Sequence, residues 1–123
     1  MTRTAREVVE AYNFELWNQK RFELAEELIA DTMIRHDVGE SRTLTRAEAL
    51  KRVTDTWAEM DSLRFDLDLV IDGGDGEHVA MVWNSTMTKG DDEVKVASIE
   101  VFRVVDGQIV EVWNCGYKLG VWA

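Results

Sequence analysis

The sequence predicts an α+β fold: three N-terminal helices, then a curved antiparallel sheet of long strands. Two observations support this class. Apolar residues recur at helical spacing in the first half of the chain, and after Asp61 and Ser62 the apolar period changes to two. Glycine-containing turns separate the alternating runs, as in a meander of neighbouring strands. With the helices on its concave side, such a sheet would form a cone that encloses a pocket.

The first and third expected helices begin with the same signal. Thr4 to Glu7 and Thr45 to Glu48 are capping boxes, in which a Thr oxygen and a Glu carboxylate satisfy free backbone donors. The second helix should carry Phe22 to Ile29 and pack against the first as a hairpin. On the third helix the apolar stripe comprises Ala47, Leu50, Val53, Thr54 and Trp57.

The strands follow from alternation and turns. Residues 32–37 form a short β-leaning segment, and residues 39–43 are expected to be a loop. Longer strands are expected over about residues 63–71, 78–88, 94–105 and 108–114. Asp106-Gly107 is a strong two-residue hairpin signal between the last two strands.

The totals limit the class of protein. A length of 123 residues fits one domain, residues 1–123, and 46% hydrophobic residues are enough for a core. A net charge of −10 argues against nucleic-acid or anionic membrane partners. With Cys115 as the sole cysteine, no internal disulfide is possible. Neither a signal peptide nor an apolar run of about 18 residues is recognisable, so we expect a cytoplasmic protein.

Glu100 is the least ordinary residue of the predicted sheet. Its strand is mainly apolar on both faces, which predicts a central strand covered on both sides. Burial would raise the pKa of Glu100 and favour its protonated form. A structural ion pair is the alternative, but Arg103 lies on the opposite face, where Glu111 across the hairpin is its better partner.

Further side chains are candidates for the pocket. His36 could be a general base, or a surface histidine at a strand end. Tyr12 could point its phenol into the pocket, or be a core tyrosine. The possible lining, which could equally be plain core, comprises Trp57, Trp83, Met87, Phe102, Trp113 and Asn114.

Other chemical templates are missing from the sequence. The glycines at residues 73–76 open a strand instead of a helix, so they do not form a phosphate loop. His36 and His78 lack the spacing of metal ligands, and there is no nucleophile elbow. Cys115 has no activating base nearby in sequence. We therefore expect neither a metal nor a cofactor.

Three segments together resemble the SnoaL-like and ketosteroid-isomerase-like branch of the nuclear-transport-factor-2-like superfamily. They are residues 8–31, residues 33–39, and residues 99–113 with the ending Arg103-Val104-Val105-Asp106-Gly107-Gln108-Ile109-Val110-Glu111-Val112-Trp113. The resemblance covers nearly the whole chain and implies a cone-shaped roll, often a homodimer. This fold hosts isomerases, cyclases, dehydratases, epoxide hydrolases and non-enzymes.

The resemblance also suggests roles for individual residues. Tyr12 matches the oxyanion-hole tyrosine of ketosteroid isomerase, and Glu100 matches the carboxylic acid that an apolar site keeps protonated beside that tyrosine. His36 falls at the position of the catalytic aspartate, although a shift of one residue would put Asp37 there. Tyr117 stands where related cyclases usually have an aspartate, which argues against their usual mechanism.

The expected function is acid–base chemistry on a small hydrophobic, carbonyl-bearing or aromatic substrate. His36 would move the proton, and Tyr12 with protonated Glu100 would stabilise the oxyanion. Isomerisation, cyclisation, dehydration and lyase-type cleavage all fit this expectation. The alternative is a non-catalytic module of the same fold that binds a hydrophobic ligand or serves as a dimerisation domain.

Overall fold

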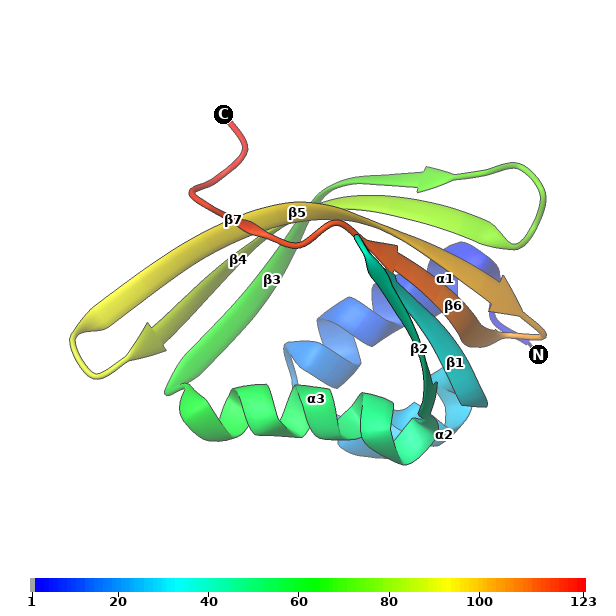
Figure 1. Cartoon of the computed structure of the whole chain (residues 1–123), viewed down its shortest axis with the longest axis horizontal. Coiled ribbons are helices and arrows are strands. Elements are labelled where there is room, and N and C mark those ends of the chain that lie inside the picture. The colour runs from blue at the N-terminus through cyan, green and yellow to red at the C-terminus, as the bar shows by residue number, and fades with distance from the viewer. Residues whose placement is uncertain (1) are drawn as a thin grey trace.

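The computed structural model describes residues 2–123 and shows a curved sheet with the helices on its concave side (Figure 1). The first helix, α1 (Ala5–Ala11), begins at Thr4. Thr4 Oγ1 accepts from Glu7 N at 3.1 Å, and the Glu7 carboxylate accepts from Thr4 N at 2.9 Å. The helix continues as a π-helix, η1 (Tyr12–Trp17). The predicted α+β class and the first capping box are confirmed.

The second helix is shorter than the sequence predicts. It consists of a 3₁₀ turn, η2 (Phe22–Leu24), and one helical turn, α2 (Ala25–Leu28). The chain becomes extended at Ile29, a residue that the helical pattern had included. The third helix, α3 (Arg46–Glu59), starts at the predicted capping box of Thr45 and Glu48.

The strands pair in the spatial order β2-β1-β6-β5-β4-β3. Their bounds are β1 (Ile29–Asp37), β2 (Glu40–Thr45), β3 (Ser62–Asp72), β4 (His78–Lys89), β5 (Asp92–Val105), β6 (Gln108–Asn114) and β7 (Lys118–Leu119). The predicted meander of β3 to β6 is antiparallel throughout. In addition, β1 pairs in parallel with β6, and β7 pairs with β5.

The segment expected to be a loop over residues 39–43 is mostly strand β2, so that prediction is wrong. Glu40 to Thr45 pair antiparallel with β1, from Asp37↔Glu40 to Thr32↔Thr45. Only Leu44 of this strand is buried. The sequence of β2 therefore shows little alternation of apolar and polar residues, and its extended conformation is determined by pairing with β1.

The Asp106-Gly107 hairpin forms as predicted between β5 and β6. Asp106 and Gly107 have φ values of 51° and 76°, the left-handed pair that a tight hairpin turn requires. A Cβ atom at Gly107 would lie 2.7 Å from Thr2 Cγ2, so any residue with a side chain would clash with Thr2 at this position.

The two faces of the sheet are covered differently, which corrects the expectation for β5. Its inward side chains Val96, Phe102 and Val104 are buried, but Ile99 on the outer face is 41% exposed. No helix of the described chain covers this face. The C-terminal segment crosses part of it, where Trp122 Nε1 donates to Trp83 O at 3.1 Å.

One side-chain contact joins the end of the first helix to the free edge of the sheet. Asn18 Nδ2 donates to Phe65 O, and Phe65 N donates to Asn18 Oδ1, both at 2.8 Å. The amide thus pairs with β3 as a short strand would, and it fixes η1 against the concave face.

Candidate active site

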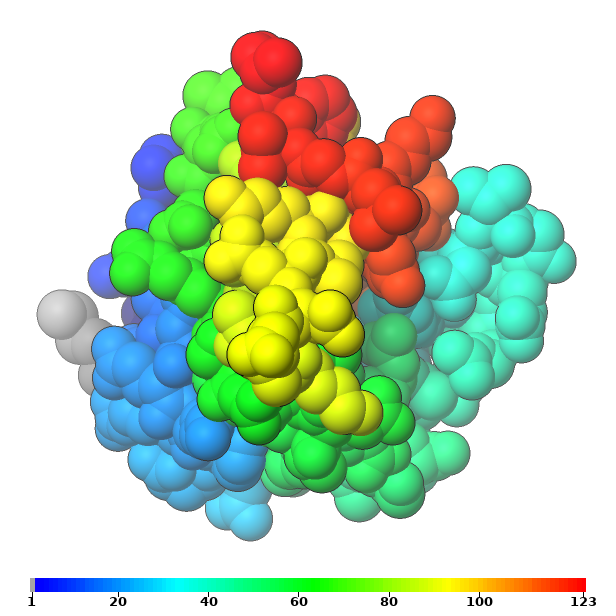
Figure 2. Space-filling view, turned by 90° about the vertical axis from the view of Figure 1, so that its left-hand side faces the viewer, coloured from blue at the N-terminus to red at the C-terminus, as the bar shows by residue number. Residues whose placement is uncertain are grey.

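A cavity of about 610 Å³ lies between the concave face of the sheet and the helices η1 and α3. Small-molecule sites typically have volumes of roughly 300–1,000 Å³. Seen in the view of Figure 2, the β4–β5 turn (yellow), the C-terminal segment (red) and the β1–β2 hairpin (cyan) surround a recess at the open side. Its inner end, about 10 Å³, has room for about one water molecule between Tyr12, Arg35, Arg52 and Glu100.

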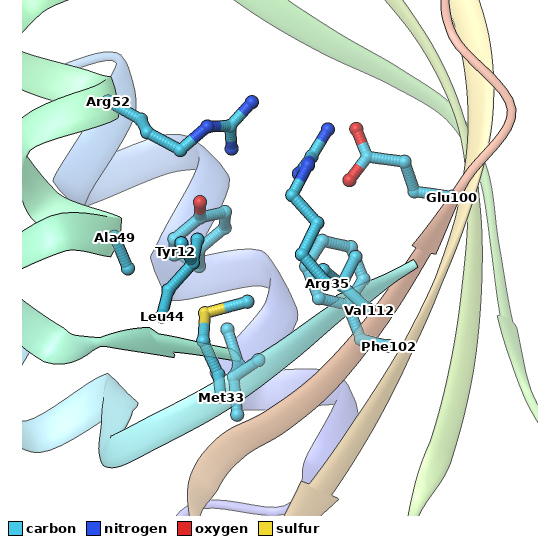
Figure 3. Close-up of a pocket in the computed structure, with 10 residues that line it drawn as sticks. Tyr12, Met33, Arg35, Leu44, Ala49, Arg52, Glu100, Phe102 and Val112 are labelled. Carbon is cyan, nitrogen blue, oxygen red and sulfur yellow. The ribbon is translucent and has the colours of Figure 1, made fainter. Parts of the chain in front are cut away.

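Tyr12 reaches the inner end of the cavity from the first residue of η1. Its hydroxyl points into the cavity in Figure 3, and its ring packs edge-on against Phe102 at 5.7 Å between centroids. Burial raises the pKa of the Tyr12 phenol, so the phenol stays protonated. It is therefore available as a hydrogen-bond donor.

Glu100 faces Tyr12 from the middle of β5. Trp83 Nε1 donates to Glu100 Oε1 at 3.1 Å, and no cation of the described chain lies within 4 Å of its carboxylate. Burial raises the pKa of Glu100 to about 7, although the nearby charge of Arg35 lowers it in part. At neutral pH, Glu100 is therefore divided between its acid and carboxylate forms.

Arg35 and Asp37 complete the polar end of the cavity from β1. Arg35 Nε lies 3.4 Å from Asp37 Oδ2, while the Arg35 guanidinium is directed toward Glu100 in Figure 3. The register places Asp37 beside Asn114, and Asn114 beside Glu100. A guanidinium thus stands between an acid that can be protonated and a carboxylate.

His36 lies on the opposite face of β1, which corrects its expected place in the cavity. Successive side chains of a strand alternate, so when Arg35 and Asp37 face inward, His36 faces outward. His36 Nε2 lies 2.5 Å from Glu111 Oε2, and its ring stacks on Trp113 at 5.1 Å. Trp113 is therefore also on the outer face, away from the cavity that it was expected to line.

The remaining predicted lining is divided. Trp83, Met87 and Asn114 line the cavity, and Phe102 closes its inner end. Trp57 does not line it, because its indole turns toward the first helix: Nε1 donates to Trp17 O at 2.9 Å, and Lys20 Nζ lies 4.2 Å above the ring.

Several polar residues of the cavity were not predicted from the sequence. Arg35 could have been found from Met33, since residues two apart on a strand share a face, and Met33 is buried. Arg52 lies one turn after the buried Ala49 on α3. Ser85 lines the far end, where its buried hydroxyl has no hydrogen-bond partner within the described chain. Ser85 could have been found by strand alternation, since it lies between the predicted lining residues Trp83 and Met87 on one face of β4.

Two features of other protein classes are missing from residues 2–123. No group of three or more His, Cys, Asp or Glu side chains in this range is arranged to hold a metal ion. Nor does any helix of the range have the length and apolar character needed to cross a membrane.

A curved sheet with helices on its concave side and a partly polar cavity between them defines the nuclear-transport-factor-2-like class. Residues 9–112 match the model of the SnoaL-like domain, and the chain belongs to this family. The comparison with curated proteins found no match.

Solved structures share the fold at low identity. A proposed polyketide cyclase from Acidithiobacillus ferrooxidans superposes with a TM-score of 0.77 at 22% identity, covering 93% of this chain and 88% of that one. SalBIII, an epoxide hydrolase/cyclase-like enzyme of pyran ring formation in salinomycin, superposes with a TM-score of 0.76 at 22% identity. The match covers 96% of this chain and 95% of that one. An LEH-like epoxide hydrolase from M. tuberculosis superposes with a TM-score of 0.75 at 17% identity, and the match covers 93% of this chain and 82% of that one.

Proposed function

We propose that this protein is an acid–base enzyme acting on a small, largely apolar carbonyl compound. The observation that carries the proposal is that proton donors and a proton acceptor lie together toward the inner end of the cavity. Glu100, whose pKa is about 7, and the protonated phenol of Tyr12 both line this end, and Asp37 lies 3.4 Å from Arg35. Enolisation needs a base, here Asp37, and hydrogen-bond donors for the enolate oxygen, here Tyr12 and protonated Glu100.

The proposed reaction begins at the carbon next to the carbonyl. Asp37 takes its proton, the C–H electron pair forms the enolate, and the negative charge moves to oxygen. Tyr12 and protonated Glu100 donate hydrogen bonds to that oxygen. In a β,γ-unsaturated substrate the enolate is a dienolate, and return of the proton from Asp37 to its γ-carbon gives isomerisation. Attack of the enolate carbon on a second carbonyl, with the proton passing to the new alkoxide oxygen, gives aldol-type cyclisation. Loss of a β-hydroxyl group from the enolate, as water formed with the proton taken by Asp37, gives dehydration.

The rest of the cavity would bind the substrate skeleton. Trp83, Met87 and Phe102 supply apolar contact, and Asn114 offers an amide near the reacting end. The family and the two cyclase-related neighbours support a cyclase or isomerase type of reaction.

An epoxide is a second candidate substrate. The arrangement of Glu100, Arg35 and Asp37 places an acid and a base on either side of a guanidinium, and two structural neighbours are named for epoxide chemistry. Glu100 would protonate the epoxide oxygen while Asp37 takes a proton from the attacking water or hydroxyl group.

Exchange of the α-protons of 2-tetralone in D₂O, followed by NMR, tests the enolisation proposal. We expect exchange above the buffer rate, and its loss in Asp37→Asn, Tyr12→Phe and Glu100→Gln. Arg64→Gln, on the outer face of β3, is the matched control and should exchange like the wild type. Binding of 2-tetralone without exchange would overturn the proposal and favour a ligand-binding module.

The homodimer expected from the resemblance remains a proposal, for which the uncovered outer face of the sheet is the candidate interface. Ile99, Leu119 and Trp122 are 41%, 79% and 46% exposed there. Light scattering at micromolar concentration should give twice the mass of one chain, and a monomer mass would contradict the proposal.

A further inference from the structure

Two arginine side chains extend into the inner end of the cavity from elements far apart in sequence. Arg35 comes from β1 and Arg52 from the second turn of α3, and in Figure 3 both guanidiniums extend toward the space in front of Glu100, Arg52 from the helix side and Arg35 from the sheet. The protein as a whole has a net charge of −10, so a pair of cations here is not a property of its general surface.

Neither guanidinium is fully satisfied by the described chain. The side chain of Arg35 is only 11% exposed, and its buried Nε has no hydrogen-bond partner, since the Asp37 contact at 3.4 Å lacks hydrogen-bond geometry. The Arg52 guanidinium forms no ion pair or hydrogen bond with any of residues 2–123. Buried cationic donors are normally paired, so Arg35 invites an anionic acceptor. Arg52 is more exposed, and its unpaired guanidinium offers further donors at the same end of the cavity.

The inner end of the cavity is lined by two guanidiniums and by one carboxylate, that of Glu100. Asp37 is the one carboxylate of the described chain paired with Arg35, and Glu100 is partly protonated at neutral pH. Asp55 on α3 also lines the cavity, but it is paired with Lys51 at 2.5 Å. Glu59 lies a further turn along α3. Burial and the charge of Arg35 both lower the pKa of Arg52, as expected for two cations that repel each other.

We propose that Arg35 and Arg52 bind a fixed carboxylate of the substrate, so that the substrates of this enzyme are carbonyl-bearing carboxylic acids. Each guanidinium presents parallel N–H donors that match a planar carboxylate. A phosphate fits less well, because α3 begins at Arg46, nearly two turns before Arg52, and its N-terminal amides are therefore distant. The inference rests on the proposed function, since it assigns a substrate class to the same cavity.

Binding of 2-naphthoate and of neutral 2-naphthamide tests this inference without turnover. Trp17 and Trp83 line the cavity, so quenching of tryptophan fluorescence can report binding. We expect the wild type to bind the acid at least about tenfold more tightly than the amide. Arg52→Gln should weaken binding of the acid by about tenfold or more and leave the amide within about twofold.

The controls separate a charge effect from damage to the fold. Arg52→Lys should keep part of the preference, because it retains charge but loses the planar donors. Arg64→Gln removes one positive charge from the outer face and should change neither affinity. Circular dichroism checks that Arg35→Gln, whose side chain is more buried, is still folded before its affinity is measured.

The outcomes distinguish this inference from the proposed function. Equal affinity for the acid and the amide, or no binding of the acid up to about 1 mM, would overturn the carboxylate site. An equal loss for both probes in Arg52→Gln would also overturn it. Tyr12→Phe should lose exchange of 2-tetralone yet retain the preference for the acid. If the preference holds while Asp37→Asn and Tyr12→Phe leave exchange unchanged, the enolisation proposal fails and the anion site stands.

Discussion

The two faces of the sheet hold their charges in opposite ways. On the outer face, a chain of close contacts between ionisable side chains runs from His36 through Glu111 and Arg103 to Glu77, at 2.5, 3.8 and 2.8 Å. On the inner face, Arg35 has one distant partner, Arg52 has none among the described residues, and Glu100 has only an indole donor. The outer groups neutralise each other near water, whereas the inner groups retain unused bonding capacity for a substrate.

The largest expected effect is a difference in activity between variants of two consecutive residues of β1, Asp37 on the inner face and His36 on the outer face. Asp37→Asn should slow exchange of 2-tetralone by about 1,000-fold, because general-base catalysis contributes roughly 10²–10⁴-fold. His36→Ala should stay within about twofold of the wild type, since its ring lies against Trp113 on the other face. A large loss in His36→Ala, with an intact fold, would remove the distinction between the faces.

The second prediction concerns stability and pH. The pKa of Glu100 is raised from 4.5 to about 7 in the folded protein, so the folded state holds this proton more tightly than the unfolded state. Stability should therefore fall as pH rises from about 4.5 to 7, by up to about 3 kcal/mol from this group, and level off above that.

Urea unfolding of the wild type and Glu100→Gln across this pH range measures the effect. The variant lacks the titration, so the difference between its free energy of unfolding and that of the wild type should grow in favour of the variant from about pH 4.5 to 7 and then level off. Parallel curves for the two proteins would show that Glu100 ionises normally. His78→Gln, on the outer face, is a control that retains the Glu100 contribution.

A smaller effect is expected where α3 is attached to the sheet. Thr45→Ala removes the side chain that accepts from Glu48 N at 3.1 Å and should cost about 1 kcal/mol in urea unfolding. Because α3 carries Arg52, fraying of its first turn should also weaken binding of 2-naphthoate slightly. Thr43→Ala, in β2 just before the cap, is the matched control for loss of a threonine hydroxyl. A loss equal to that of Thr45→Ala would argue against the cap.

The smallest effect is expected on the outer face. A double-mutant cycle of His36→Ala and Glu111→Gln should give a coupling energy of about 0.5 kcal/mol at pH 6, because partly exposed ion pairs contribute little. Raising the salt concentration should reduce the coupling further. A coupling well above 1 kcal/mol would mean that the outer chain of charges holds the sheet as firmly as core contacts do.

The sequence predicted the parts of the fold that local patterns encode. The two Thr-Glu capping boxes, the apolar alternation at the start of β3 and the Asp106-Gly107 turn are local, and all three appear in the structure. Strand β2 was missed because its polar residues become a strand only by pairing with β1. The family prediction rested on motifs spread along the chain and is confirmed by the match over residues 9–112.

The site was harder to predict than the fold. Tyr12 and Glu100 follow from helical spacing and strand alternation, and the structure places both at one cavity. The choice between His36 and Asp37 depends on whether Met33 or Ile34 faces inward. Both are apolar, so the sequence leaves both faces open, and the structure buries Met33, the residue that shares a face with Asp37. Arg35 and Arg52 meet only through the packing of α3 beneath β1, so their pairing could not be predicted from spacing.

The contact between Asn18 and Phe65 has a consequence for solubility. The strand β3 is an outer edge of the sheet, and an edge with free N–H and C=O groups can pair with a strand of another molecule. The Asn18 amide occupies the N–H and C=O of Phe65 at that edge. A foreign strand would first have to displace this amide, so the residue that orients the helix over the cavity also hinders edge-to-edge aggregation.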